Sequence, residues 1–578
     1  MAQPNVKSQS TPEFVGVNLR RDTVMIADNE LASASNVDFY AEPGVVRPRS
    51  GIWELTTAAA TGRVSYLAKL YQSYRYSIIG GTTVYADAVS QTSALTGDIS
   101  TMAAYRPLND LAVFMFIANQ AAMNKHNATG LTKWGIDAPT VAPVVAVGAA
   151  GSLTGDYSIR FTYARVVGGV ICSESNPSPV SNTASLTSDV LSLSTLTDST
   201  DSQVTHKIIY RTTSGGATYL RDQMIATGTT TGTSSQADTA LTDLLETDND
   251  PPPNANWCWT HLETMFLVQD PSNPHYLWYS KRFLPEQFPP SNFLEVGSPN
   301  DPLQCGLSHS GTCGIFTRST KYQVLGNDAS GFYVQEAPSH RGTPAPHSVC
   351  VSEYGVIFLS RDGVYSTTFG GVDTKLSDAI EGIFLGQTVN GYAPINWNAV
   401  NRCYGRVWKG RYFLAYCSGS NTTPDIMAVY SFIMSHWSFY DLAVTALNWE
   451  EDYDKLMIGQ SDGTIHQMEV GTSDNGTAIT MSATTKDYVG EEGSTVWKLF
   501  QWLQVDADTD GETVTVQFYA NDVLRGTLSV STTARTTRTF DLQEAAMGQR
   551  WHARISYTGA KTPKVYHLSA FYTPLSAI

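Results

Sequence analysis

The sequence YRYSIIGGTTVYA at Tyr74–Ala86 has a pattern that is repeated in YGVIFLSRDGVYS at Tyr354–Ser366 and in DKLMIGQSDGTIHQM at Asp454–Met468. In each stretch an apolar run meets a short turn with glycine, and a second run then opens with an apolar or aromatic residue. Gly-Gly and Asp-Gly supply the positive φ that tight hairpin turns need. The three stretches therefore predict β-hairpins.

Related hairpin-like stretches fill much of the remaining chain: Leu111–Trp134, Leu262–Tyr279, Cys313–Leu325 and Tyr412–Trp437. So many short strands would leave exposed edges unless they repeat around an axis, as the blades of a β-propeller do. We therefore expect a mainly β protein built on a β-propeller, with six blades. The alternative is a set of unrelated hairpins in ordinary sandwiches.

Two segments depart from the hairpin pattern and predict further domains. Residues 139–253 are rich in Thr, Ser, Gly and Ala, are bounded by prolines and contain short strands, which is typical of an inserted immunoglobulin- or fibronectin-III-like β-sandwich. Residues 472–578 predict a C-terminal β-sandwich. Residues 1–138 then hold an N-terminal arm and the first propeller strands, and residues 254–471 hold the remainder of the propeller.

Charge and composition narrow the classes of function. The 578 residues include 37 Lys and Arg against 53 Asp and Glu, a formal net charge of −16. This balance argues against a protein that grips nucleic acid along a basic stripe, although it allows nucleic acid to pass by.

The longest apolar run, Leu111–Ala118, is too short for a membrane-spanning helix, and no signal peptide is visible. The seven cysteines show no CxxC spacing, so we expect reduced, mostly buried thiols.

Four short patterns that suggest chemistry have simpler explanations. They are G-x-S-x-G at 459–463, an acidic run at Asp506, Asp508 and Asp510, the Asp-box-like Ser360–Gly363, and the loose set His340, His347 and Cys350. A nucleophile elbow needs a following helix, a Ca²⁺ loop needs a closing Glu, and zinc needs tighter ligand pairs. We expect turns and strand entries instead, with a weak Ca²⁺ site as the alternative for the acidic run. The sequence predicts no catalytic residue, no metal ligand and no cofactor, and hence a protein that is not an enzyme.

The N-terminal stretch GVNLRRDTVMIADNELASASNVDFYAEPGVVRPRSGI, at Gly16–Ile52, has a recognisable order of pieces. It resembles the opening of the tail nozzle or tail tubular protein B family of short-tailed bacteriophages, which is related to proteins that stabilise packaged DNA. The matching pieces are Asp28-Asn29-Glu30, Ala34, Asn36-Val37, Gly44, Arg47–Gly51, Trp134-Gly135-Ile136 with Pro139, Asp362–Tyr365, Val429–Tyr440 and Ile458–Gly471. Family members often read Arg-Pro-Gly where this chain has Arg49-Ser50 before Gly51, which is a departure.

The resemblance implies a structural virion protein, assembled in the host cytoplasm. Six copies would form a homo-hexameric ring that retains packaged DNA and then forms the exit channel for genome ejection. The ring would dock on a tail adaptor or gatekeeper ring, support tail fibres or tailspikes, and pass double-stranded DNA without sequence-specific binding. Arg47 and Arg49 are candidate contacts to a neighbouring subunit or adaptor, since guanidinium pairs bidentately with carboxylates; a solvated turn is the alternative.

Three other functions stay open at this point. The chain could be another tail hub or a plug at the head–tail junction. It could be a propeller glycosidase, which needs a convergent pair of carboxylates, or a glycan-binding adhesin built on the two sandwich-like segments.

Overall fold

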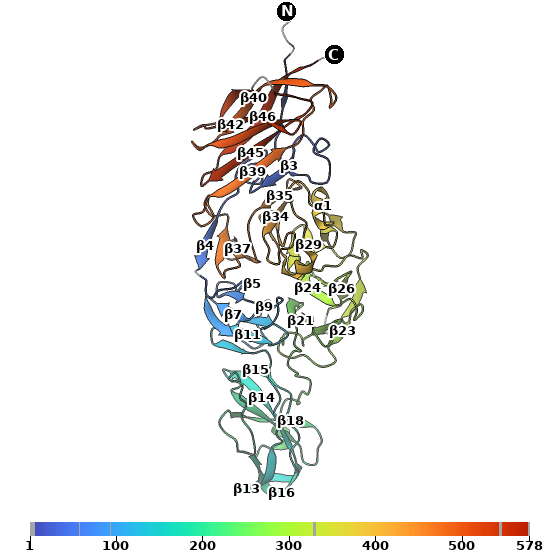
Figure 1. Cartoon of the computed structure of the whole chain (residues 1–578). Coiled ribbons are helices and arrows are strands. Elements are labelled where there is room, and N and C mark those ends of the chain that lie inside the picture. The colour runs from blue at the N-terminus through green and yellow to red at the C-terminus, as the bar shows by residue number, and fades with distance from the viewer. Residues whose placement is uncertain (1–5, 57, 93, 328–330, 543–545, 576–578) are drawn as a thin grey trace, which may run out of the picture. The chain divides into compact units, whose positions relative to one another are not determined.

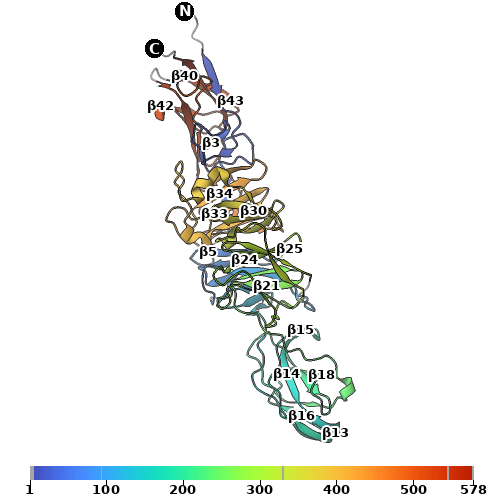
Figure 2. The same cartoon turned by 90° about the vertical axis from the view of Figure 1, so that its right-hand side faces the viewer.

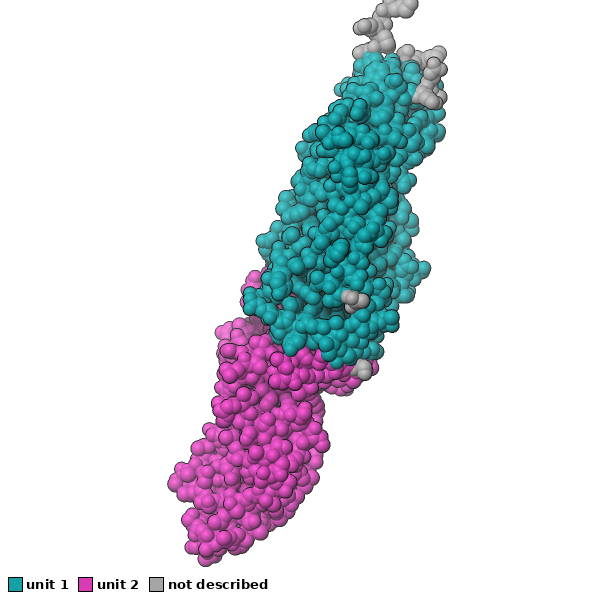
Figure 3. Space-filling view, turned by 90° about the vertical axis from the view of Figure 1, so that its left-hand side faces the viewer, with its two compact units in different colours: residues 1–90, 343–578 teal, residues 91–342 magenta. Residues whose placement is uncertain are grey.

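The computed structural model describes residues 6–56, 58–92, 94–327, 331–542 and 546–575. The chain divides into two compact units, residues 1–90 with 343–578 and residues 91–342, coloured separately in Figure 3. Strands dominate both units, as predicted. The only α-helix among the described residues is α1, Glu381–Phe384, which is a single short turn. In the described part of the chain, no helix has the length and apolar character to span a bilayer.

The first unit holds three antiparallel sheets of four strands, and the four antiparallel strands β32–β35 form one end of a larger sheet. The first strand of each contacts the first strand of the next, in the order β28, β32, β36 and β5. Sheets that meet along their first strands are arranged as propeller blades are. The strands are β5 Val64–Lys69, β6 Arg75–Ile79, β7 Thr83–Ala86, β8 Val89–Thr92, β28 Cys350–Ser352, β29 Gly355–Ser360, β30 Gly363–Thr367, β31 Thr374–Lys375, β32 Tyr404–Trp408, β33 Arg411–Tyr416, β34 Ile426–Ser431, β35 His436–Tyr440, β36 Ala446–Glu450, β37 Lys455–Gly459 and β38 Ile465–Met468.

One of these blades is completed by a strand from the opposite part of the sequence. β4, Ile52–Thr56, pairs antiparallel with β38, and Ile52 lies opposite Met468. Figure 1 shows blue β4 in the same blade as orange β37. β4 thereby covers the edge that β38 would otherwise leave open.

The second unit contains three more sheets of the same kind, and β20 contacts both β9 and β24. With the four strands β32–β35, which belong to a larger sheet, the described residues thus contain seven blade-like sets of four strands, whereas six blades were expected. Each of the seven sets contains one of the hairpin-like stretches quoted from the sequence. The sequence pattern did not show that β4, from residues 52–56, completes the set at residues 446–468, because the two segments are far apart in the sequence. The strands are β9 Thr101–Tyr105, β10 Phe114–Ala118, β11 Asn124–Asn127, β12 Gly130–Lys133, β20 Trp257–His261, β21 Thr264–Val268, β22 Tyr276–Tyr279, β23 Phe293–Glu295, β24 Leu303–His309, β25 Thr312–Thr317, β26 Lys321–Leu325 and β27 Tyr333–Glu336.

The insert in the second unit is a pair of β-sheets around one apolar core. One sheet has the order β13-β16-β19 and the other β15-β14-β17-β18. Phe161 and Ile209 from one sheet share the core with Leu153 and Leu191 from the other. The immunoglobulin-like assignment of this insert stays a prediction. The strands are β13 Val144–Tyr157, β14 Ile159–Val167, β15 Val170–Glu174, β16 Ala184–Ser194, β17 His206–Thr212, β18 Tyr219–Ala226 and β19 Gly232–Ser234.

The first unit also contains two sheets built from both ends of the chain. One is ordered β1-β46-β40-β43, with β44 also on β40; the other continues the blade β32–β35 through β2 and β3 into β39-β45-β41-β42. Figure 2 shows β3, β40, β42 and β43 in this region. The strands are β1 Lys7–Ser10, β2 Gly16–Val17, β3 Glu30–Ser35, β39 Ile479–Thr485, β40 Lys498–Asp508, β41 Val514–Ala520, β42 Val523–Val530, β43 Thr536–Asp541, β44 Met547–Gly548, β45 Trp551–Gly559 and β46 Lys564–Pro574.

The predicted hairpins and the predicted burial of the cysteines are confirmed. The three quoted stretches form β6–β7, β29–β30 and β37–β38, and their turns place Gly80, Gly81 and Gly463 at positive φ. All seven cysteines are buried and unpaired. A continuous core then runs from the blade strands through Trp437 to Trp551.

Close packing between β37 and β5 leads to a prediction about stability. A Cβ placed on Gly459 would lie 2.5 Å from Val64 Cβ, which is fully buried. Gly459→Ala should therefore lower the free energy of unfolding by about 1–3 kcal/mol in urea titrations. Gly370→Ala is the matched control, since no atom lies within 4 Å of its added Cβ. Equal stability of the two variants would contradict this packing.

Candidate functional site

The N-terminal segment joins the blade β32–β35 to the C-terminal strands. β2 lies between β35 and β3, and β3 pairs with β39 on its other side. The alternating small residues of β3 suit this position, because Leu31 and Ala34 point into the core while Ser33 and Ser35 remain part-exposed. The segment is therefore an internal strand of a long sheet, and its contacts hold two parts of the first unit together.

Arg49 is the central side chain of this join. It is 2% exposed, and its Nη1 and Nη2 donate to Asp474 Oδ1 and Oδ2 at 2.8 and 2.6 Å. Its Nε donates to Asn36 Oδ1 at 2.9 Å, and Nη1 also donates to the Ser50 carbonyl at 3.0 Å. These partners are internal and the guanidinium is buried, so Arg49 is already paired within its own chain. Its contact with another subunit stays a prediction.

Arg47, the second predicted interface residue, is part-buried and lies 4.0 Å from Glu42 Oε2 through its Nη1. The structure places it near Glu42 and away from the Arg49–Asp474 pair. Its predicted role in contacting a partner stays a prediction.

Asn36 and Gly51 complete what we call the arm junction, defined as Asn36, Arg49, Gly51 and Asp474. Asn36 has a φ of 56°, its N–H donates to the Phe439 carbonyl at 2.8 Å, and its Nδ2 donates to the Thr480 carbonyl at 2.8 Å. Gly51 exchanges two backbone hydrogen bonds with Val470 and Gly471. A Cβ on Gly51 would lie 2.0 Å from the Ser473 carbonyl oxygen, so only glycine fits.

A second polar contact fixes β3 against β35. Glu30 accepts from Asn18 Nδ2 at 2.9 Å and from the Ala27 N–H at 2.8 Å, and its Oε1 lies 3.7 Å from His436 Nε2. Burial opposes ionisation of Glu30, but the bonds from His436, Asn18 and Ala27 outweigh it and lower its pKa to about 2. The bond to Glu30 is also the largest cause that raises the pKa of His436.

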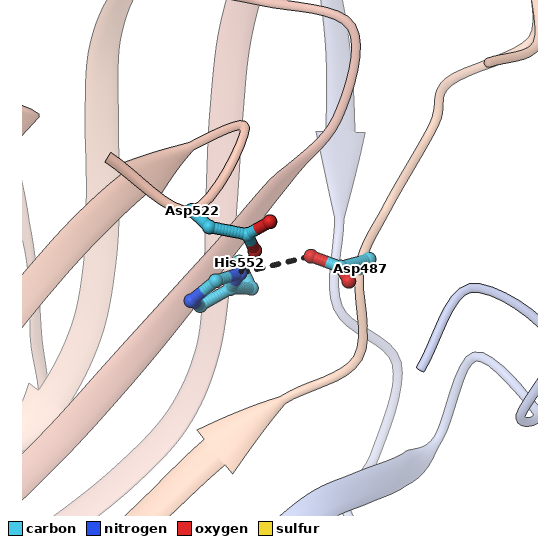
Figure 4. A group of neighbouring side chains, drawn as sticks. All are labelled: Asp487, Asp522 and His552. Atoms are coloured by element: carbon cyan, nitrogen blue, oxygen red, sulfur yellow. Dashed lines mark hydrogen bonds and ion pairs between the residues drawn. The ribbon is translucent and has the colours of Figure 1, made fainter. Parts of the chain in front are cut away.

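Asp487, Asp522 and His552 form the one group of three potential metal ligands found among the described residues, with ligand atoms within 4.8 Å of one another (Figure 4). His552 Nδ1 lies 2.8 Å from Asp487 Oδ1, and Thr23 Oγ1 donates to Asp487 Oδ2 at 2.5 Å. Arg550 pairs with Asp522 and lies 3.7 Å from Asp487. Since the Arg550 guanidinium already pairs with Asp522 and lies near Asp487, and His552 and Thr23 occupy the oxygens of Asp487, the group fits an internal polar network better than a cation site.

A groove of about 500 Å³ lies in the first unit, lined in part by residues of β3, β35, β39 and β45. Hydroxyl side chains from β3 and β39 line one wall, and Asp441 supplies its one carboxylate. Hydrolysis of a glycosidic bond needs two carboxylates across the scissile bond, which this lining does not offer. The lining residues are Ser33, Ser35, Asn390, Gly391, Tyr392, Ile426, Phe439, Tyr440, Asp441, Ser482, Thr484 and Arg554.

The motifs singled out from the sequence lie in turns and strands. Ser461 is in the β37–β38 turn, where Asp462 Oδ1 accepts from the Thr464 N–H at 3.0 Å. Tyr365 donates its hydroxyl proton to Asp362 in the β29–β30 hairpin at 2.7 Å. Neither serine nor aspartate has the strand-to-helix setting of a nucleophile elbow.

The acidic run and the His/Cys set also have structural partners. Asp506 accepts from Arg535 Nη2 at 2.7 Å, and Asp508 Oδ1 accepts from the Asp510 N–H at 3.2 Å. His340 is exposed beside Glu336, whereas His347 is buried and stacks on Tyr404 with ring centroids 4.5 Å apart. Cys350 is buried in β28, and burial raises its pKa to about 12, so its thiol stays protonated.

Comparison with known proteins gives only distant structural matches. No family model matches the chain, and no curated protein matches its sequence. The WD40 β-propeller domain of Doa1 is 8% identical, with a TM-score of 0.33, over 72% of this chain and 96% of that one. An exo-β-1,3-galactanase from Phanerochaete chrysosporium, solved with galactose, is 7% identical, with a TM-score of 0.22, over 53% of this chain and 93% of that one.

Because Arg49 is buried, its removal should greatly lower the stability of the fold. Arg49→Met should lower the free energy of unfolding by about 2–4 kcal/mol, because Asp474 and Asn36 lose their partner. Arg47→Met should cost less than about 1 kcal/mol, as expected for a part-exposed pair at 4.0 Å. Urea denaturation of both variants measures the difference, and similar losses would argue against the arm junction.

The Glu30–His436 contact predicts a pH window of stability. The folded pKa of Glu30 lies below its ordinary 4.5, so its contribution is present above pH 4.5 and fades as pH falls toward about 2. The folded pKa of His436 lies above its ordinary 6.5, so its contribution is complete below pH 6.5 and fades as pH rises through the folded value. His436→Gln should therefore destabilise most between about pH 4.5 and 6.5, by about 1 kcal/mol or more.

Thermal unfolding measured from pH 3 to 9 tests this window. His340→Gln is the control, because His340 is exposed and its ion-pair partner among the described residues is exposed Glu336. A uniform loss across the range for His436→Gln would mean that the histidine acts through packing alone.

Proposed function

We propose that this chain is the subunit of a tail nozzle of the tail tubular protein B kind in a short-tailed bacteriophage. In this proposal six copies form a ring at the end of the virion tail. The ring retains packaged DNA and then becomes the channel through which the genome leaves. The chain acts as a structural protein and catalyses no reaction.

The observation that carries the proposal is that the sequence segments resembling the family contact one another in the fold. The piece at 47–51 and the piece at 458–471 exchange backbone hydrogen bonds through Gly51, Val470 and Gly471. Asn36 of a third piece binds the Phe439 carbonyl in the piece at 429–440. Pieces that are separate in the sequence thus form one join, which supports a shared architecture behind the resemblance.

Charge is compatible with a conduit for DNA. Each subunit carries a formal charge of −16, so a ring of six would carry −96. Acidic groups facing the channel would repel phosphates and shorten the residence of passing DNA, whereas a basic wall would hold it. The proposed ring therefore contacts double-stranded DNA without reading its sequence.

The remaining partners follow from the same proposal. One end of the ring would dock on an adaptor or gatekeeper ring of the tail, and the outside would support fibres or tailspikes. The rivals make different predictions: a glycosidase would turn over host polysaccharide, and an adhesin would bind glycans without forming a ring.

Native mass measurement of the purified protein tests the proposal. We expect a species of six times the 62.9 kDa subunit mass, and no retardation of double-stranded DNA at physiological salt. A stable monomer that hydrolyses or binds host glycans would contradict it.

A further inference from the structure

One edge of the sheet β1-β46-β40-β43 is an open strand. β43 pairs with β40 on one side only within the described residues, in an unbroken register from Asp541 opposite Trp502 to Thr536 opposite Ala507. Five of its six residues are exposed, and the sixth, Phe540, is part-buried against the core. The backbone N–H and C=O groups on the outer side of such a strand are free to pair with another chain.

β43 lacks two features that protect an edge, a proline and a β-bulge, although it carries the charges of Arg538 and Asp541. Its sequence, TTRTFD, is rich in β-forming Thr and contains no Pro and no Lys, and its pairing with β40 has no bulge. Natural edges of this kind invite strand addition unless a partner covers them. The strand therefore points to an intermolecular contact.

The opposite edge of the same sheet is β1, which pairs with β46 on one side only in the described part of the chain. The three pairings β1–β46, β46–β40 and β40–β43 are all antiparallel. Because the four strands alternate in direction, β1 and β43 run in opposite directions. If an identical sheet is added edge to edge in the same orientation, β1 of the added copy lies beside β43 of the first copy and runs antiparallel to it.

The two edges differ in charge. β43 carries exposed Arg538, which forms no ion pair with any residue that the structure describes, and exposed Asp541; Arg535, just before the strand, pairs with Asp506 and has its side chain 57% exposed. Lys7 of β1 pairs with Glu492 at 2.6 Å and with Glu491 at 3.4 Å, so two carboxylates share one ammonium group, and Glu491 has 87% of its side chain exposed. The unpaired guanidinium of Arg538 at one edge is therefore complementary to the excess carboxylate beside the other edge.

We propose that the subunits of the ring join by pairing of β43 with β1 of the next copy, with Arg538 facing Glu491 across the contact. The contact is head to tail, because the two edges are different surfaces. Contacts of this type form rings when the rotation between copies closes after a whole number of copies, here six, and open filaments when it does not. The inference rests on the proposed ring and adds to it the strands through which the ring closes.

Charge reversal at the two edges tests this contact. Arg538→Glu should raise the dissociation constant of the assembly at least about tenfold, as native mass spectra over a dilution series would measure. Glu491→Arg alone should weaken the assembly similarly, and the double variant should recover most of the loss. Arg554→Glu is the matched control: Arg554 is also exposed, but it lies on β45, inside the other sheet. Circular dichroism and thermal unfolding show whether each variant keeps its fold.

The outcomes separate the two proposals. If the unaltered protein is monomeric, both the proposed ring and the β43–β1 contact fail. If it forms a ring and Arg538→Glu assembles like the Arg554→Glu control, the ring stands and the contact is overturned. Hydrogen exchange gives a second readout: amides of β43 should all be protected in the ring, whereas alternate amides should exchange fast in dissociated Arg538→Glu.

Discussion

The return of the first 56 residues to the last part of the chain is the interaction on which the first unit depends. β1 pairs with β46, β3 with β39 and β4 with β38, so one N-terminal segment closes a blade and contributes to both C-terminal sheets. Closing such long loops costs chain entropy, which must be offset by contacts formed only when the ends meet. The buried bidentate pair of Arg49 and Asp474 lies at the middle of these contacts.

The same arrangement explains which features were predictable from sequence. Hairpins are local, and their period-2 pattern with glycine turns predicted β6–β7, β29–β30 and β37–β38 correctly. That β4 completes the blade of β37 and β38 was not predicted, because β4 and β38 are distant in sequence. The internal partner of Arg49 was not predicted either, because nothing near Arg49 in sequence reveals Asp474. The steric need for Gly51 against Ser473 was a possible signal, but it is visible only once both segments are placed.

Asp487 is buried and is paired with His552 and with part-exposed Arg550, and burial raises the pKa of the Cys350 thiol. Separating a buried ion pair is costly, so the contacts of Asp487 hold the local geometry of the C-terminal strands. The strongly negative net charge and the open strand edge are the two features on which the proposed assembly rests.

The central claim is that this rigid β subunit works as part of a ring around an open channel. Averaged electron-microscope images of the purified, unaltered protein test it most directly. The account predicts end-on views with sixfold symmetry and a clear central hole. Images of isolated subunits, or of a closed assembly with no passage through it, would contradict it.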